Sequence, residues 1–185
     1  MSPVIGVLAI QGDFEAHARA LREVGAEPRI VRTADDLEEG LDGLVIPGGE
    51  STTMTLGIER ENLAEPLREL VRSGRPVLGT CAGLIMLDRE HLGLLDVRAR
   101  RNAFGRQRHS FETELDMDGL GPIRAVFIRA PWVEEHGGDV EILAEVDGHP
   151  VAVRQDNILA VAFHPELTDN RALHRWLLER VGVLS

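Results

Sequence analysis

Short apolar runs and amphipathic segments alternate along the first half of the chain. Four segments predict strands, at residues 4–10, 27–31, 44–46 and 77–79. Apolar residues at helical spacing predict helices at 14–24 and 63–71, and each is followed by a glycine that ends it. Strands that alternate with helices form βαβ units. This half therefore predicts a mostly parallel sheet with helices on both faces.

The second half has a different pattern, in which short strands follow one another with few helices between them. The predicted strands lie at 110–117, 125–128, 140–146, 150–154 and 158–162. Asp147-Gly148 and Asp156-Asn157 are the predicted turns of antiparallel hairpins. A final amphipathic helix is predicted over 170–181, with Thr168 or Asp169 as its N-cap. The pattern is that of one α/β domain over residues 1–185, with antiparallel strands added to the parallel sheet.

The only cysteine lies between two glycines, in Gly79-Thr80-Cys81-Ala82-Gly83, directly after a predicted buried strand. A lone cysteine is more often an inert core residue than a nucleophile. Here, however, the G-x-C-x-G pattern is typical of the strand–turn–helix nucleophile elbow, and we expect the glycines to allow its sharp turn. The start of the next helix would favour the thiolate. Cys81 is the candidate nucleophile.

A histidine and a carboxylate follow another short apolar run, in Phe163-His164-Pro165-Glu166. In an extended segment, residues i and i+2 project to the same side, so Glu166 could orient His164 toward Cys81. This is the relay of nucleophile, base and orienting acid. A metal site at His164 and Glu166 is disfavoured because no third ligand has suitable spacing.

A glycine-rich turn at residues 47–53 leads into a predicted helix. It could be an ordinary loop or a phosphate-binding loop, although the lysine of a P-loop is missing. It could also form an oxyanion hole, in which the backbone N–H groups of Gly49 and Ala82 face a developing negative charge. The parallel sheet places this turn, Cys81 and His164 after the carboxyl ends of neighbouring strands, where active sites form.

Arginines form a basic cluster inside an otherwise acidic chain. The cluster comprises Arg98, Arg100, Arg101, Arg106 and Arg108, and Arg129 follows a predicted strand further on. Such a run is usually a solvated face, but one guanidinium could hold a substrate carboxylate through two hydrogen bonds. Spacing alone does not choose between these arginines.

Composition excludes several classes of function. The net charge of −11 argues against nucleic acid or an anionic membrane as the main partner. One cysteine excludes an internal disulfide and a cysteine-rich zinc site, and a reactive thiol suits the reducing cytoplasm. The apolar run at 4–10 is too short to span a bilayer and lacks the flanks of a signal peptide.

These motifs together resemble the glutaminase subunits of two-component pyridoxal 5′-phosphate synthases, which are class I, triad-type glutamine amidotransferases. The similar segments are distributed along the whole chain, at residues 6–12, 47–54, 79–86, 101–107, 127–131 and 163–168. The elbow and His-Pro-Glu are common to the wider class. Segments 47–54 and 101–107 are much more specific to this subfamily.

The resemblance implies a flavodoxin-like, three-layer α/β/α fold and hydrolysis of L-glutamine to L-glutamate and ammonia. It implies a triad of Cys81, His164 and Glu166, without a metal or cofactor. Glutamine contacts are implied for Gly48, Gly49, Glu50, Arg101, Ile128 and Arg129. The implied partner is a (β/α)₈-barrel synthase subunit that uses the ammonia to make vitamin B6. We expect it to contact the Gln11-Gly12 turn.

Two alternatives remain open at this level. One is a related α/β cysteine hydrolase without glutaminase activity, which Glu166 and the arginine-bearing segments disfavour. The other is a non-catalytic regulatory subunit, which the presence of Cys81 and His164 disfavours. Release of ammonia from glutamine but not from asparagine would exclude the first alternative. Activity of this chain mixed with a synthase subunit would exclude the second.

Overall fold

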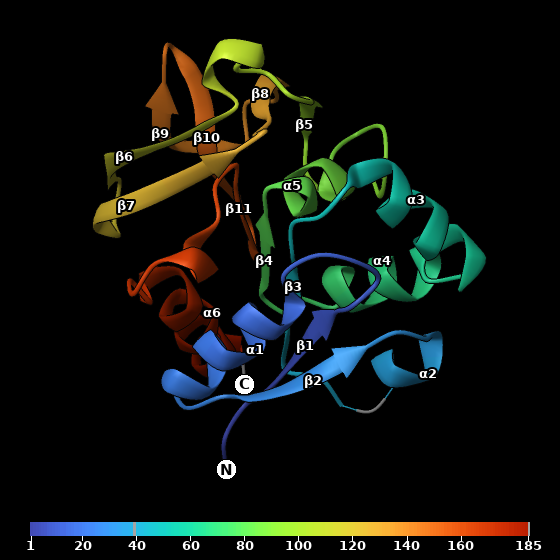
Figure 1. The fold of residues 1–185 in the computed structure, drawn as a ribbon. Coiled ribbons are helices and arrows are strands. Elements are labelled where there is room, and N and C mark those ends of the chain that lie inside the picture. The colour runs from blue at the N-terminus through green and yellow to red at the C-terminus, as the bar shows by residue number, and fades with distance from the viewer. Residues whose placement is uncertain (39, 185) are drawn as a thin grey trace.

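A seven-stranded sheet forms the centre of the protein in a computed structural model, which describes residues 1–38 and 40–184 (Figure 1). Five neighbouring strands are parallel: in spatial order β2 (Glu27–Val31), β1 (Val4–Leu8), β3 (Gly43–Ile46), β4 (Val77–Thr80) and β11 (Ile158–Val161). Antiparallel β10 (His149–Gln155) and β9 (Glu141–Val146) extend the sheet beyond β11. The predicted mostly parallel sheet with added antiparallel strands is confirmed.

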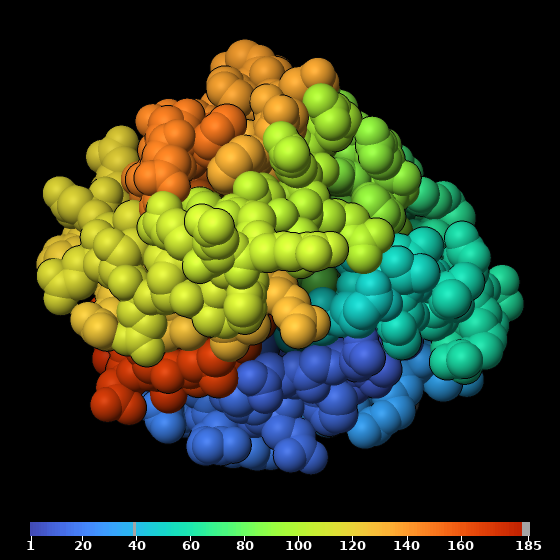
Figure 2. Space-filling view, turned by 45° about the horizontal axis from the view of Figure 1, so that its top comes forward, coloured from blue at the N-terminus to red at the C-terminus, as the bar shows by residue number. Residues whose placement is uncertain are grey.

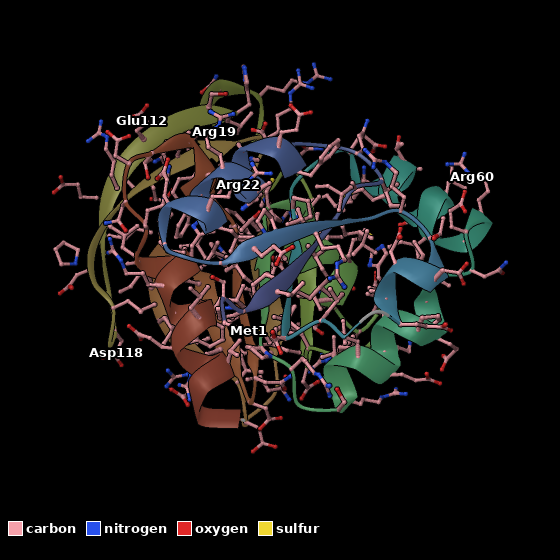
Figure 3. The ribbon with its side chains drawn as sticks, turned by 90° about the horizontal axis from the view of Figure 1, so that it is seen from below. Met1, Arg19, Arg22, Arg60, Glu112 and Asp118 are labelled. Carbon is pink, nitrogen blue, oxygen red and sulfur yellow. The ribbon has the colours of Figure 1, made fainter. Side chains whose placement is uncertain are left out.

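Helices cover both faces of this sheet and complete three layers. Helices α1 (Phe14–Glu23) and α6 (Ala172–Leu184) pack on one face, against β1, β2, β3 and β4. On the other side lie α2 (Ala34–Leu37), α3 (Ser51–Arg60), α4 (Ala64–Arg72) and α5 (Ala82–Leu87). Figure 3 shows the two groups of helices on opposite sides of the strands. Every residue of β3, β4 and β11 is buried, as expected for strands covered on both faces.

Two small antiparallel sheets lie beyond the end of the main sheet near the carboxyl ends of β4 and β11 (Figure 1). One pairs β5 (Val97–Arg100) with β8 (Trp132–His136), and neither strand was predicted from the sequence. The other pairs β6 (Ser110–Met117) with β7 (Gly121–Ile128), so the predicted strand at 125–128 begins four residues earlier. Short 3₁₀ helices occur at η1 (Arg106–Arg108) and η2 (Pro165–Leu167).

The turns of the second half are largely as predicted, but the last helix begins later. Asp147 and Gly148 have φ values of 53° and 78°, as a two-residue hairpin between β9 and β10 requires. Helix α6 begins at Ala172, whose N–H donates to Asn170 Oδ1 at 2.9 Å. The predicted N-cap at Thr168 or Asp169 is therefore wrong. Among the described residues, no helix is long and apolar enough to cross a membrane.

Candidate active site

Parallel pairing of β4 with β11 brings the candidate nucleophile and histidine to the same edge of the sheet. Thr80 lies beside Val161, and the N–H of Cys81 donates to the carbonyl of Val161 at 2.8 Å. The N–H of His164 donates to the carbonyl of Val126 in β7 at 2.9 Å. Backbone hydrogen bonds therefore fix both loops where parallel strands end.

Cys81 occupies a strained turn between β4 and α5. Its φ and ψ values are 51° and −111°, a conformation that costs a non-glycine residue about 1–3 kcal/mol. The strained residue of the elbow is thus the cysteine itself, because neither flanking glycine has a positive φ. A Cβ on Gly83 would lie 2.0 Å from the carbonyl oxygen of Ile46, and one on Gly79 would lie 2.7 Å from Leu87 Cδ1. The prediction that these glycines supply the turn is wrong: they give the clearance for α5 to pack against the strands.

His164 connects Cys81 to Glu166. Its Nδ1 lies 2.9 Å from Glu166 Oε2, and Cys81 lies close enough to the ring to raise its pKa. Burial alone would lower the pKa of His164, but the interactions with Cys81 and Glu166 outweigh it and raise the pKa to about 10. His164 is therefore an imidazolium at neutral pH. The predicted contact with Glu166 is present, although Glu166 lies in η2 and not in an extended segment.

The glycine-rich turn after β3 packs directly against His164 and Cys81. A Cβ on Gly48 would lie 2.8 Å from His164 Cε1 and 3.2 Å from Cys81 Cβ, so only glycine fits there without displacing the histidine. Gly49 has a φ of 157°, and Gln11 Oε1 accepts a hydrogen bond from the N–H of Glu50 at 2.7 Å. Gln11, in the turn after β1, thus fixes the glycine-rich turn after β3.

A cleft of about 360 Å³ opens over Cys81. The sequence-predicted residues that line it are Gly49, Glu50, Cys81, Ala82, Arg101, Ile128, Arg129 and His164. Figure 2 shows the surface hollowed between the cyan α3 region, the yellow-green segment after β5 and the blue N-terminal segment. The carbonyl oxygen of Ile128 lies 3.9 Å from Cys81 Sγ. Glu166 is buried behind His164, and Gln11 and Gly48 support the cleft without lining it.

Opposite charges lie at the cleft wall. Glu50 accepts from the N–H groups of Thr53 at 2.7 Å and Thr52 at 3.1 Å, and Arg101 contacts its Oε1 at 3.2 Å. The backbone hydrogen bond from Thr53, followed by the bond from its hydroxyl, lowers the pKa of Glu50 to about 2. Glu50 is therefore ionised at neutral pH and can face a cationic group of a ligand.

The structure separates the arginines that the sequence left as alternatives. Arg98 pairs with Glu135 at 3.1 Å, and Arg108 pairs with Asp147 at 2.5 Å while its guanidinium lies 4.2 Å from the Phe111 ring centre. Neither lines the cleft, whereas Arg101 and Arg129 do. Arg129 reaches it because its φ of 46° turns the chain at the end of β7.

Sequence reasoning missed several residues of the cleft wall, namely Asp13, Ser51, Ile85, Asn102, Pro131 and Leu167. All of them except Asp13 lie inside the segments at 47–54, 79–86, 101–107, 127–131 and 163–168 that carry the resemblance, so membership of those segments was the available signal. Within residues 1–38 and 40–184, no group of three or more His, Cys, Asp or Glu side chains could hold a metal ion.

Residues 7–183 match the SNO glutamine amidotransferase family. Two similar relatives are named pyridoxal 5′-phosphate synthase subunit PdxT. The protein from Mycobacteroides abscessus is 52% identical over 98% of both chains. The one from Frankia alni is 53% identical over 97% of this chain and 95% of its own.

Solved structures agree with this match. A crystal structure described as a glutamine amidotransferase is 45% identical and superposes with a TM-score of 0.90, over 96% of this chain and 98% of its own. The structure of PurLQS from Thermotoga maritima has a TM-score of 0.74 over 99% of both chains at 18% identity, which shows a shared fold alone.

Proposed function

The chain belongs to the SNO glutamine amidotransferase family, and on that premise we propose that Cys81, His164 and Glu166 are the catalytic triad of a glutaminase. The observation that carries the proposal is His164, which bridges Cys81 and Glu166 at the floor of the cleft. The enzyme hydrolyses L-glutamine to L-glutamate and ammonia, and it supplies the ammonia for vitamin B6 biosynthesis.

The geometry accounts for both halves of the reaction. The Cys81 thiolate attacks the side-chain amide carbon of glutamine, and the N–H groups of Gly49 and Ala82 hold the oxyanion. The His164 imidazolium gives its proton to the departing ammonia. The neutral His164 then takes a proton from water, which attacks the γ-glutamyl thioester and releases glutamate. This step restores the thiolate–imidazolium pair.

The cleft walls supply contacts for the amino-acid end of the substrate. Glu50 faces the α-ammonium group, and Arg101 or Arg129 holds the α-carboxylate. The main chain of Gly49 and Ile128 lines the remainder of the glutamine site, and Gly48 packs behind it against His164 and Cys81.

Replacing Arg101 by alanine is expected to weaken glutamine binding about tenfold, because a hydrogen bond to a charged group is lost at a half-exposed position. The measurement is calorimetric titration of glutamine into the inactive Cys81→Ala protein, with and without the second substitution. Arg98→Ala is the matched control, since Arg98 pairs with Glu135 away from the cleft. Unchanged affinity in Arg101→Ala would leave Arg129 as the carboxylate ligand.

The partner is a (β/α)₈-barrel synthase subunit, which makes pyridoxal 5′-phosphate from a pentose phosphate, a triose phosphate and the ammonia. Ammonia that escapes into bulk water is protonated and loses nucleophilicity, so direct delivery favours a two-subunit enzyme. The PdxT relatives are named as subunits of that synthase. We place the complex in the cytoplasm, where a catalytic thiol stays reduced.

Docking of the synthase subunit is expected to turn the N–H of the flexible Gly48-Gly49 peptide into the site, and the gain of this oxyanion donor should raise glutamate release about 10²–10³-fold. Docking at the Gln11-Gly12 turn would act on the oxyanion loop, because Gln11 already holds the N–H of Glu50. The experiment compares this chain alone and with its cognate synthase subunit at saturating glutamine, with asparagine as the control substrate.

Gln11→Ala should reduce this rise. It is a cleaner probe than Gly48→Ala, whose new methyl group would displace His164. Equal rates with and without the partner would refute activation, and hydrolysis of asparagine at a similar rate would refute the assignment of glutamine as the substrate.

A further inference from the structure

A chain of buried polar side chains continues the triad beyond Glu166. His17 of α1 and His174 of α6 are both fully buried, and His17 Nδ1 lies 3.0 Å from His174 Nε2. On its other side, His17 Nε2 lies 3.2 Å from Thr80 Oγ1 and 3.5 Å from Glu166 Oε1. Thr80 directly precedes Cys81, so this cluster lies immediately behind the catalytic residues.

The second oxygen of the triad carboxylate lacks a strong donor. Glu166 Oε2 contacts His164, but Oε1 is buried and, among the described residues, makes no hydrogen bond of ordinary geometry. Its contact with His17 Nε2 exceeds the usual N–H···O range by about 0.3 Å. A buried carboxylate oxygen without a donor is costly, and His17 Nε2 is the nitrogen that lies against it.

Only one arrangement of protons serves Glu166. If His17 carries its proton on Nε2, that N–H faces Glu166 Oε1 and Thr80, while Nδ1 accepts from His174 Nε2–H. His174 Nδ1 is then an acceptor without a partner. The opposite arrangement turns a lone pair of His17 toward the carboxylate and leaves His174 Nδ1–H as a buried donor without an acceptor. Orphaned donors are the rarer and less favourable case.

Both imidazoles of this pair are neutral. Burial, followed by the nearby His174, lowers the pKa of His17 well below its usual value, and burial lowers that of His174 to about 4. A neutral donor satisfies Glu166 Oε1 without cancelling its negative charge. The charge therefore remains available to the His164 imidazolium.

We infer that His17 is a positioning residue that holds the Glu166 carboxylate in line with His164, with His174 fixing its tautomer. This inference rests on the proposed triad. The same helix, α1, exposes Arg19 and Arg22 on its outer side (Figure 3) and buries His17 against the sheet. It begins at Phe14, just after the Gln11-Gly12 turn, so adjacent segments of the chain contact Glu166 and the oxyanion loop.

Replacing His17 by glutamine or by asparagine tests whether it positions the Glu166 carboxylate or only fills space, because both side chains end in an amide. The amide nitrogen of Gln reaches the place of histidine Nε2, whereas that of Asn reaches only the place of Nδ1. In the complex with the synthase subunit, His17→Asn is expected to lower kcat for glutamine about tenfold with little change in KM, and His17→Gln to retain most of it. Equal kcat in His17→Asn and the unaltered protein, or equal losses in both variants, overturns the inference.

A double-mutant cycle tests whether His17 acts through Glu166. In a Glu166→Gln background, His17→Asn should cause little further loss of kcat. If His17 acted independently of Glu166, the fold-losses in kcat of the two substitutions would multiply. The proton resonance of His164 Nδ1 gives a readout without turnover: His17→Asn should shift it and His17→Gln should not. An unaltered complex that releases no glutamate refutes the proposed function, and an unshifted resonance in His17→Asn refutes the role of His17.

Discussion

Replacing Cys81 by alanine is expected to abolish glutamine hydrolysis and to leave the fold intact. Cys81 is the only thiol in the chain, so no other side chain can form the γ-glutamyl thioester. In a serine protease, removal of the nucleophile lowers kcat by a factor of about 10⁶. The substitution removes one sulfur atom at a 7% exposed position, so the packing of α5 against the sheet should persist.

Glutamate release by the complex, followed beside thermal unfolding of the isolated chain, checks this expectation. Cys81→Ser is the matched control, because serine keeps the shape and the strained backbone but replaces the thiolate with a weak nucleophile. Both variants should be inactive and should bind the synthase subunit. Turnover by Cys81→Ala within about a hundredfold of the unaltered enzyme would contradict the nucleophile assignment.

Replacing His164 by asparagine is expected to remove nearly all activity, by about 10⁴ or more, because the leaving ammonia loses its proton donor. Glu166→Gln should cost less, since the orienting member of a triad usually contributes less than its nucleophile or base. Single-turnover rates of the two variants in complex check this order. A Glu166→Gln enzyme with full turnover would reduce Glu166 to a structural hydrogen-bond acceptor.

The pH dependence follows from the raised pKa of His164. Below its folded pKa of about 10 the imidazolium is present, so kcat/KM should hold through neutral pH and fall as the pH rises through about 10. Glu166→Gln removes a charge that raises the pKa of His164, so its alkaline limb should move to lower pH.

Sequence patterns predicted the parallel half of the fold well because its signals are local. Buried strands appear as short apolar runs, and the glycines after α1 and α4 end those helices with φ values of 95° and 98°. Strands β5 and β8 were missed because they pair across more than thirty residues and carry charged side chains, so neither reads as an apolar run.

The residues that meet at the candidate site were predicted more fully than the backbone geometry that places them. Cys81, His164 and the glycine-rich turn meet as expected, yet the positive φ lies on Cys81, and the glycines serve packing. His17 and His174 could not be paired from sequence, because 157 positions separate them. One signal was available: His17 interrupts the apolar stripe of α1, where a buried polar residue needs partners from other elements.

In the proposed reaction one thiol, held at the end of β4, carries the acyl group of glutamine. The most direct test treats the complex with a glutamine-like diazoketone and maps the adduct by peptide mass spectrometry. We expect one adduct per chain, located on Cys81, formed at the rate at which glutaminase activity is lost and slowed by glutamine. An adduct on any other residue that accompanies the loss of activity would contradict it.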